Sequence, residues 1–536
     1  MFSYEKCKGK VASFGRNLDR ATFFMSSVIG TGNLWRFPMM LAVYGNKGGL
    51  VFILAWLLLT FIWTSPIMIL ECALARYATE GVLGSFRQLF GNRFLWMAAW
   101  VCLVLFFITS YYCVLIGWNM YYFSYFLVNP LPTAVEESHA IFENFTSSKW
   151  GFLTQGLCIL LAGLSVLSGY KLIEKTNRVL VPFLLFSLLY GFFTALCQSH
   201  SNLGIQLMFK PNWESLTNVH VWIGAMGQNA FDTWAGTGIL TRISAFAFPP
   251  IKIVQYSVLI PASNNVISLL AGIMLFISAM ATVSFEPFAT SHQTLVGIYD
   301  RYNYESFMYI WAPMLYMKDG TFGRILAIIF FLSLTVGGIS QMISSIEVLL
   351  GIYMEFGRKR VIGIVVISCA IFLMGIPSTL YRSFLWGQDY TWTFGTTMSG
   401  LMFITIALGI GTDHIREKII NIFKNDWHLP KAWDYMIKVI CPLEITILVI
   451  WWLCVIIIGE PPDVNKLKLF SEWIIVMFFL ILANGIYLLC MKYFRHYFVD
   501  EEENIIFQPE EIYRKYSTNI FHENEEAIKT LAESKN

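Results

Sequence analysis

The sequence contains little charge and no concentrated basic region. Only 13% of its 536 residues are charged, and the formal net charge of +2 comes without a compact run of lysine or arginine. Soluble domains have about 25% charged residues, and proteins that bind nucleic acid carry clustered basic side chains. The composition therefore argues against a soluble domain and against a nucleic-acid partner.

Patterns typical of metal sites and enzymes are also missing. The ten cysteines show no CxxC or mixed cysteine and histidine spacing, and most lie in apolar runs, where a buried free thiol is the simpler interpretation. The chain lacks a phosphate-binding loop and a nucleophile with a placed base. We predict that the protein is not an enzyme.

What the chain has is long apolar runs. Hydrophobic residues make up 56% and aromatic residues 16% of the sequence, and the mean hydropathy is +0.59. A helix of roughly 20 residues crosses the hydrocarbon core of a bilayer. The sequence predicts an all-α polytopic membrane protein with twelve transmembrane helices. The predicted spans are 21–46, 49–75, 94–128, 151–169, 178–197, 221–247, 254–283, 323–355, 361–381, 391–411, 434–458 and 471–494.

Basic residues mark one side of this predicted membrane domain. Residues 1–20 contain five lysines and arginines but no apolar core of a signal peptide, and residues 358–360 on the same side are basic as well. The positive-inside rule then makes both termini cytoplasmic. We predict a multi-pass protein of the plasma membrane, surrounded by lipid.

The predicted opposite side includes the loop 129–150, where Asn144 begins an N-glycosylation sequon. The tail 496–536 has 10 acidic and 4 basic residues, which predicts a solvated, acidic cytoplasmic segment. Between the N-terminal segment 1–20 and this tail we place one transporter domain over 21–495. Its parts are a first repeat over about 21–197, a second over about 221–411, and helices 11 and 12 over about 434–494.

Two of the apolar runs are interrupted by the same short motif. Residues 30–34 read GTGNL and residues 236–240 read GTGIL, five predicted helices apart. Paired interruptions at corresponding positions of two halves indicate a transporter built from inverted repeats, with its site near the bilayer midplane. Glycine pairs also serve close helix packing, which is the alternative interpretation.

Polar groups near these interruptions favour a cation site. Asn33, Arg36, Asp232 and Asn264 all lie within apolar spans. Arg36 could instead extend to the interface and Asn264 could pack between helices. A carboxylate such as Asp232 needs a cation, a partner or a proton there. Carbonyl, amide and hydroxyl oxygens at broken helices suit a hard cation.

The motifs also resemble a known family. GTGNLWRFPMM, GNKGGLVF and SPIMILECALARY are similar to the first two helices of the neurotransmitter:sodium symporters, near the amino-acid rather than the monoamine transporters. SYYCVLIGWNMYYF, GQNAFDTWAGTG and LTVGGISQMISSIE resemble their third, sixth and eighth helices. The resemblance implies a leucine-transporter-like fold, a five-plus-five inverted repeat with interrupted helices 1 and 6.

The resemblance implies two sodium sites. The first would take Val28, Asn33, Asp232 and Asn264, and the second Ser26, Ile29, Gly337 and Ser340. The second site lacks one oxygen, because Ile339 stands where the family has an oxygen-bearing side chain. The resident carboxylate at Asp232 leaves potassium open as an alternative to sodium.

The resemblance also implies a substrate pocket. Tyr112 matches the tyrosine whose hydroxyl binds a substrate carboxylate, and Gly30 stands where monoamine transporters have an aspartate. These matches favour an amino acid or small carboxylate, and the bulky Trp234 favours a compact one. The remaining implied pocket residues are Ile108, Phe231, Thr237 and Ser344.

Chloride and gate positions differ from the family pattern. Gln228 and Ser268 match chloride ligands, but Asp232 places a negative charge beside them, so we predict that chloride is not required. Arg36 and Asp389 match an outer gate. The positions of the inner gate pair fall near Val11 and Met354, which cannot form an ion pair, and Lys10, Arg16 or Glu355 are possible substitutes.

Together these features predict a symporter that couples the entry of sodium, or another alkali cation, to uptake of a small amino acid or related carboxylate. The alternative is a non-transporting relative that acts as a membrane receptor or assembly partner. The sequence indicates no specific protein partner.

Overall fold

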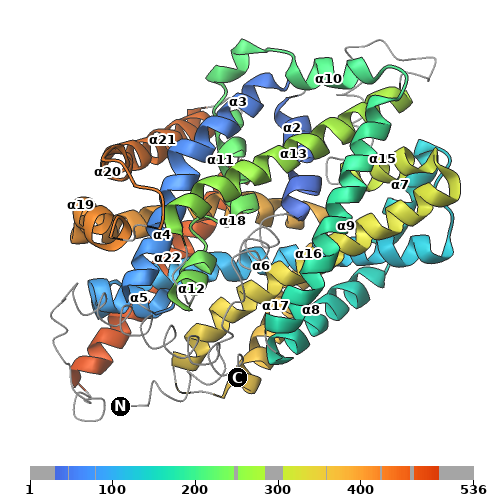
Figure 1. Cartoon of the computed structure of the whole chain (residues 1–536). Coiled ribbons are helices and arrows are strands. Elements are labelled where there is room, and N and C mark those ends of the chain that lie inside the picture. The colour runs from blue at the N-terminus through green and yellow to red at the C-terminus, as the bar shows by residue number, and fades with distance from the viewer. Residues whose placement is uncertain are drawn as a thin grey trace, which may run out of the picture.

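The computed structural model describes residues 30–45, 48–78, 80–168, 170–246, 252–283, 306–355, 357, 359–422, 425–458 and 464–493. These residues form helices joined mainly by short turns, and the described part contains no strand. Figure 1 shows the long helices crossing the molecule obliquely, with shorter helices covering their ends.

The helices of the first half follow one another closely along the chain. They are η2 (Gly32–Arg36), α2 (Phe37–Tyr44), α3 (Leu50–Leu59), η3 (Thr60–Thr64), α4 (Ser65–Ala78), α5 (Val82–Phe90), η4 (Asn92–Phe94), α6 (Leu95–Val128), α7 (Val135–Thr146), α8 (Trp150–Ser168), α9 (Tyr170–Leu196), α10 (Ser201–Phe209) and η5 (Trp213–Thr217).

The second half begins with a helix pair that is separated by a short irregular segment. Its elements are α11 (Val219–Thr233), α12 (Ile239–Phe246), α13 (Ile253–Val283), α15 (Phe307–Met317), α16 (Gly320–Glu355), α17 (Arg360–Leu380), α18 (Arg382–Ile410), α19 (Thr412–His414), η7 (Ile415–Ile420), α20 (Ala432–Tyr435), η8 (Met436–Ile440), α21 (Cys441–Ile458) and α22 (Val464–Tyr493).

The apolar helices agree with the predicted spans. Within the described residues nine helices are long and apolar enough to cross a membrane, and a tenth results if residues 181–196 and 201–209, which meet at 105°, count as one bent span. The remaining predicted spans are the two interrupted ones, and the first of these is described only from residue 30.

Two segments that we predicted as loops are helical. Residues 170–177 belong to α9, so α8 and α9 are separated by residue 169 alone. Residues 135–146 of the predicted loop 129–150 form α7, in which Val135, Phe142 and Phe145 are buried. The prediction for residues 135–146 rested on polarity, but a helix with one apolar face also has a polar face.

Helices α6 and α16 form the centre of the bundle. They contain 34 and 36 residues, and each is therefore roughly 50 Å long. They pack against each other along the molecule (Figure 1). Aromatic side chains fill their contact, such as the rings of Tyr122 and Phe331 with centroids 5.0 Å apart. The two helices thus provide a continuous wall on which site residues can be held.

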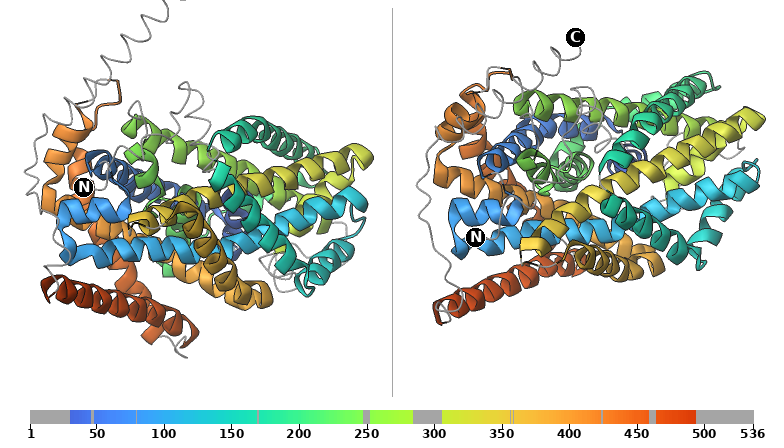
Figure 2. Two further views of the ribbon diagram at one scale, coloured as in Figure 1. Left: turned by 90° about the horizontal axis from the view of Figure 1, so that it is seen from below. Right: turned by 60° about the horizontal axis from the view of Figure 1, so that its bottom comes forward.

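The helices at the edge of the bundle have a different surface. The most apolar stretch of α22 contains no buried residue, and α17 is also mostly exposed. Figure 2 shows α22 lying along the outside of the bundle in both views. Leu373, Phe478 and Ile481 are among the exposed side chains. Such an apolar surface is stable in lipid rather than in water.

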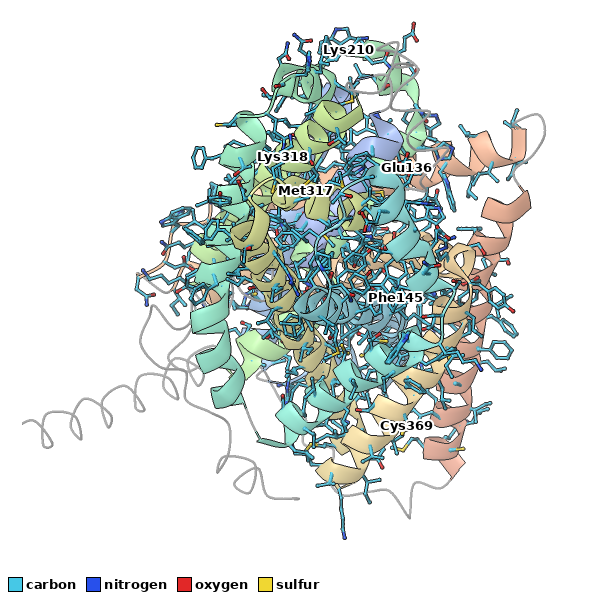
Figure 3. The ribbon with its side chains drawn as sticks, turned by 90° about the vertical axis from the view of Figure 1, so that its right-hand side faces the viewer. Glu136, Phe145, Lys210, Met317, Lys318 and Cys369 are labelled. Carbon is cyan, nitrogen blue, oxygen red and sulfur yellow. The ribbon has the colours of Figure 1, made fainter. Side chains whose placement is uncertain are left out.

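Helices α7 and α15 cover one end of α6. Figure 3 shows α7, between the labelled Glu136 and Phe145, across from Met317 and Lys318 at the end of α15. The hydroxyl of Ser138 donates to the Ile310 carbonyl over 3.0 Å. We call this the α7 end of the bundle. The opposite end, where α5 lies beside the start of α6, is the α5 end.

Candidate functional site

The second interruption has the geometry that its glycines predict. Helix α11 ends at Thr233, and α12 begins at Ile239. Between them Trp234, Gly236 and Gly238 have φ angles of 59°, 81° and 83°. This left-handed conformation is readily adopted by glycine but is unusual for a bulky residue. The predicted break in helix 6 is therefore confirmed.

A buried carboxylate on α4 stabilises this break. Glu71 Oε2 accepts a hydrogen bond from Gly236 N at 3.0 Å, and Oε1 accepts from Thr241 N at 3.0 Å and from Thr241 Oγ1 at 3.2 Å. These donors would otherwise be unpaired where the helix is interrupted. We assigned Glu71 no role from the sequence, although a lone carboxylate in the apolar run 65–75 is a signal that could have indicated it.

The first interruption contacts the second directly. Its described part begins with Gly30 and Thr31, followed by η2, a turn of π-helix. A Cβ atom added to Gly32 would lie 3.0 Å from Asp232 Cβ. A side chain at this position would push against Asp232 on α11, so glycine favours the close approach of η2 to α11. This contact brings the polar residues of the two interruptions into one cluster.

Asn33 links the first interruption to α13. Its Oδ1 accepts a hydrogen bond from Gly30 N at 2.9 Å. Its Nδ2 donates to Asn264 Oδ1 at 2.6 Å, to Asn264 O at 3.1 Å and to Ser268 Oγ at 2.9 Å. Three positions that we predicted as ion ligands thus share one buried hydrogen-bond network.

Asp232 lies in the same cluster and is almost fully buried. Its Oδ2 accepts from Gln228 Nε2 at 3.2 Å. The Asn264 amide also interacts with this carboxylate. A buried carboxylate in one cluster with two amide oxygens suits a hard cation such as sodium. The residues present therefore fit an alkali cation.

The residues of this cluster fit an anion less well than a cation. Gln228 Nε2, the donor that a chloride ion would need, also points to Gly32 O at 3.1 Å, and Gln228 Oε1 accepts from Arg36 Nη1 at 3.0 Å. The Asp232 carboxylate is thus a neighbour of both Gln228 and the Asn33 cluster. A second negative charge at this position would be repelled at short range.

Arg36 and Asp389 form a buried ion pair next to this network. Arg36 Nε lies 3.0 Å from Asp389 Oδ1, and Arg36 Nη2 donates to Oδ2 at 3.0 Å. Asp389 also accepts from the Tyr111 hydroxyl at 3.1 Å, and the Arg36 guanidinium lies 5.0 Å from the Phe231 ring centroid. The two side chains are together as expected, and their role as a gate stays a prediction.

The implied pocket residues gather around Tyr112. The Tyr112 ring meets Phe231 and Trp234 edge-on, with centroids 5.9 Å apart in each case. The Tyr112 hydroxyl accepts from Thr31 Oγ1 at 2.6 Å and donates to Gln341 Oε1. We did not single out Gln341 from the sequence, because a glutamine in an apolar helix carries no motif.

The other implied pocket residues are buried but differ in their contacts. Ile108 lies one turn before Tyr112 on α6. Thr237 Oγ1 donates to the Trp234 carbonyl at 2.7 Å, and Ser344 Oγ donates to Ser340 O at 3.3 Å. The Thr237 hydroxyl therefore stabilises the second interruption itself.

The second cation site is described only in part. Ser340 and Gly337 lie on α16, and Ser340 Oγ donates to Val336 O at 3.0 Å. Its other expected ligands, Ser26 and Ile29, lie outside the described residues. Val28 of the first site lies outside them as well. Ile339 is buried in the core.

Charged side chains gather at the α5 end. Glu347 on α16 forms an ion pair with Arg360, and Arg242 Nη2 lies 3.9 Å from Glu347 Oε2. Glu355 lies 3.7 Å from Arg87. Of the possible substitutes for the inner gate, Glu355 therefore has a partner on α5. Lys10 and Arg16 lie outside the described residues.

Comparison with known proteins agrees with this arrangement. The model of the sodium:neurotransmitter symporter family matches residues 14–151 and 139–499. The chain belongs to this family. It is therefore a multi-pass membrane protein of a sodium-dependent transporter family, as the apolar helices also indicate.

Its relatives include a transporter named as sodium-dependent and one named as sodium- and chloride-dependent. An uncharacterised sodium-dependent transporter of Methanocaldococcus jannaschii is 26% identical over 461 residues, which cover 82% of this chain and 89% of the relative. The sodium- and chloride-dependent GABA transporter ine of Drosophila melanogaster is 25% identical over 506 residues, covering 83% of this chain. These residues are 51% of the Drosophila relative.

A solved structure confirms the predicted fold. The crystal structure of MhsT in complex with L-phenylalanine superposes with a TM-score of 0.72 at 22% sequence identity. The match covers 82% of this chain and 99% of the MhsT chain. The predicted inverted-repeat transporter fold, with interrupted helices at corresponding places, is therefore correct.

Proposed function

We propose that this member of the family is a secondary active symporter that couples sodium entry to uptake of a small amino acid or related carboxylate, without a need for chloride. One observation carries the proposal: the buried Asp232 carboxylate lies with Asn33 and Asn264 where the two interruptions meet. Such a site gives a cation oxygen ligands at the place where substrate binds.

The pocket supports an amino acid as the substrate. The Tyr112 hydroxyl and Thr31 lie beside the first interruption, where a carboxylate can be bound, and Gly30 provides no carboxylate that would select a monoamine. The MhsT complex contains L-phenylalanine. In this chain the buried ring of Trp234 stacks on Phe231 with centroids 6.3 Å apart. The ring reduces the space, which supports a substrate smaller than phenylalanine.

Chloride independence rests on Asp232. Its carboxylate already accepts from Gln228, one of the two side chains that we matched to chloride ligands. The Asp232 carboxylate can balance the charge of a bound cation. In a site without this carboxylate, a bound chloride ion would have to do so. The same charge leaves potassium as a second possible coupling ion, which cation replacement would detect.

The orientation that we propose has both termini in the cytoplasm of a plasma-membrane protein. It places α7, with the exposed Asn144, outside the cell. Asn144→Gln should then increase the electrophoretic mobility of the expressed protein and make it insensitive to a glycosidase. An unchanged mobility, with wild-type protein also insensitive, would contradict this orientation.

Ion-replacement flux measurements test the coupling. Uptake of labelled glycine, alanine and leucine into proteoliposomes is expected in sodium, not in choline, and to be unchanged when gluconate replaces chloride. Asn33→Ala should abolish the sodium-dependent flux. Asp232→Ser should make the flux chloride-dependent, because the anion then supplies the missing charge. Loss of wild-type uptake in gluconate would overturn chloride independence.

The non-transporting alternative is favoured by one observation. Trp234 and the carboxamide of Gln341 occupy much of the space around Tyr112, as they would in a receptor or assembly partner that no longer admits substrate. Correctly inserted protein that binds amino acids but shows no flux in any cation would support this alternative over symport.

A further inference from the structure

The Tyr112 hydroxyl already has partners on both sides. It accepts a hydrogen bond from Thr31 Oγ1 at 2.6 Å and donates its own proton to Gln341 Oε1. A phenolic hydroxyl has one proton to donate, and so does the threonine hydroxyl. In this structure both protons are therefore used, and Tyr112 has none left for a substrate carboxylate.

The Gln341 carboxamide lies in the place where such a carboxylate would bind. Gln341 is buried in the middle of α16. A Cβ atom added to Gly30 would lie 3.1 Å from Gln341 Nε2 and 3.3 Å from Gln341 Oε1. The amide thus fills the space between the first interruption and the Tyr112 hydroxyl. Glycine at position 30 makes room for it.

The carboxamide is similar to a carboxylate in shape and in one acceptor oxygen. A carboxylate that accepts from Tyr112 must replace Gln341 Oε1, since both cannot accept the same proton. The displaced side chain also needs part of the pocket volume, which Trp234 and Phe231 already limit. Binding therefore includes the cost of breaking one buried hydrogen bond.

We propose that Gln341 is a specificity-determining residue: its carboxamide occupies the position of the substrate carboxylate in the empty site and is displaced by small zwitterionic amino acids. This inference rests on the proposed function, because it takes Tyr112 as the carboxylate-binding group. The Gln341 carboxamide competes with the substrate carboxylate for Tyr112. It therefore weakens the binding of every carboxylate substrate and excludes substrates with large side chains.

The test measures equilibrium binding to purified full-length protein in sodium. The ligands are glycine, alanine, leucine and alaninamide, which has an amide in place of the carboxylate. Gln341→Ala removes the competitor, and it should lower the Kd for alanine about fivefold, as expected for one net hydrogen bond. Leucine should gain at least as much, since volume is released, whereas alaninamide should gain less than alanine.

Two further variants separate the hydrogen bond from general effects. Gln341→Glu keeps the shape and an acceptor but adds a negative charge, so alanine should bind about tenfold more weakly or not at all. It also serves as the test variant if Gln341→Ala does not fold. Gln198→Ala truncates a buried glutamine between α9 and α10, outside the pocket, and should leave every Kd unchanged.

The outcomes distinguish this inference from the proposed function. Alanine binding that is unchanged or weaker in Gln341→Ala would overturn the inference alone, as would an equal gain for alaninamide or wild-type affinity in Gln341→Glu. If no amino acid binds to the wild type or to any variant, the proposed function fails and the inference fails with it.

Discussion

The ion pair of Arg36 and Asp389 differs from the pair of Arg87 and Glu355 in one physical respect. Both partners of the first are buried, with side-chain exposures of 3% and 0%, and they meet through several hydrogen bonds. In the second pair Arg87 is 50% exposed and Glu355 19% exposed, and the charged atoms are 3.7 Å apart. Water can replace the partner in the second pair but not in the first.

If both pairs act as gates, this difference predicts which closure of the central site is the stronger. Separating Arg36 from Asp389 would leave two charges without solvent, so the pair acts as one unit unless water enters. The contact between Arg87 and Glu355 at the α5 end is partly solvated and is worth little. We therefore expect the α5 end to open at a smaller cost in free energy than the contact between Arg36 and Asp389.

The largest effect is expected when the buried pair loses one partner. Arg36→Gln should lower the free energy of unfolding by about 3–5 kcal/mol, because Asp389 then stays buried and charged beside Tyr111. Denaturant unfolding of the purified protein measures the change. The double variant Arg36→Gln with Asp389→Asn should lose less than Arg36→Gln alone.

The matched control is an arginine on the same helix as Asp389. Arg382 pairs with Glu143 of α7, but both side chains are about one-third exposed. Arg382→Gln should therefore cost at most about 1 kcal/mol. If it costs as much as Arg36→Gln, burial is not the reason for the difference between the two closures.

The sequence predicted the buried pair of Arg36 and Asp389 and its surroundings well. Arg36 and Asp389 were matched by position relative to motifs, and both interruptions were located from glycine spacing. Motifs are informative there because left-handed backbone and close helix contacts permit few residues, as at Gly236 and Gly32. The family resemblance assigned Asn33 and Asn264 to one cation site, and the structure places the two side chains within hydrogen-bond distance.

The α5 end could not be predicted in the same way. Pairs such as Glu347 with Arg360 depend on which helix ends meet, and this follows from packing rather than from a local pattern. Gln341 and Glu71 were missed for a related reason. Each is a single polar residue in an apolar run, and its meaning depends on the atom opposite it in the fold.

An intermediate effect is expected at Glu347, which combines features of both regions. Its carboxylate is buried, but its partners Arg360 and Arg242 are partly exposed. Glu347→Gln should lower the free energy of unfolding by about 1–3 kcal/mol, because a charge-assisted hydrogen bond is lost while the arginines can turn to water. Arg360 also keeps its bond to Val166 O.

A second measurement on the Glu347 variant tests whether the α5 end becomes more accessible to reagents. If this cluster holds α12 against α16, Glu347→Gln should also increase the labelling rate of a cysteine introduced at Ser244 by a membrane-permeant thiol reagent in intact cells. The Ser244 hydroxyl donates to Cys72 O at 2.8 Å in the closed arrangement. An unchanged labelling rate would mean that the cluster stabilises the helices without closing the α5 end.

The smallest effect is expected at the pair of Arg87 and Glu355. Arg87→Ala should change the free energy of unfolding by less than about 1 kcal/mol, and the difference from wild type should disappear in about 1 M salt, where screening acts over roughly 3 Å. The loss from Arg36→Gln should persist in the same salt, because ions do not reach a buried pair. Unfolding curves of both variants at low and high salt provide the comparison. A salt-insensitive loss at Arg87 would show that water does not enter the α5 end, and the two closures would then be equivalent.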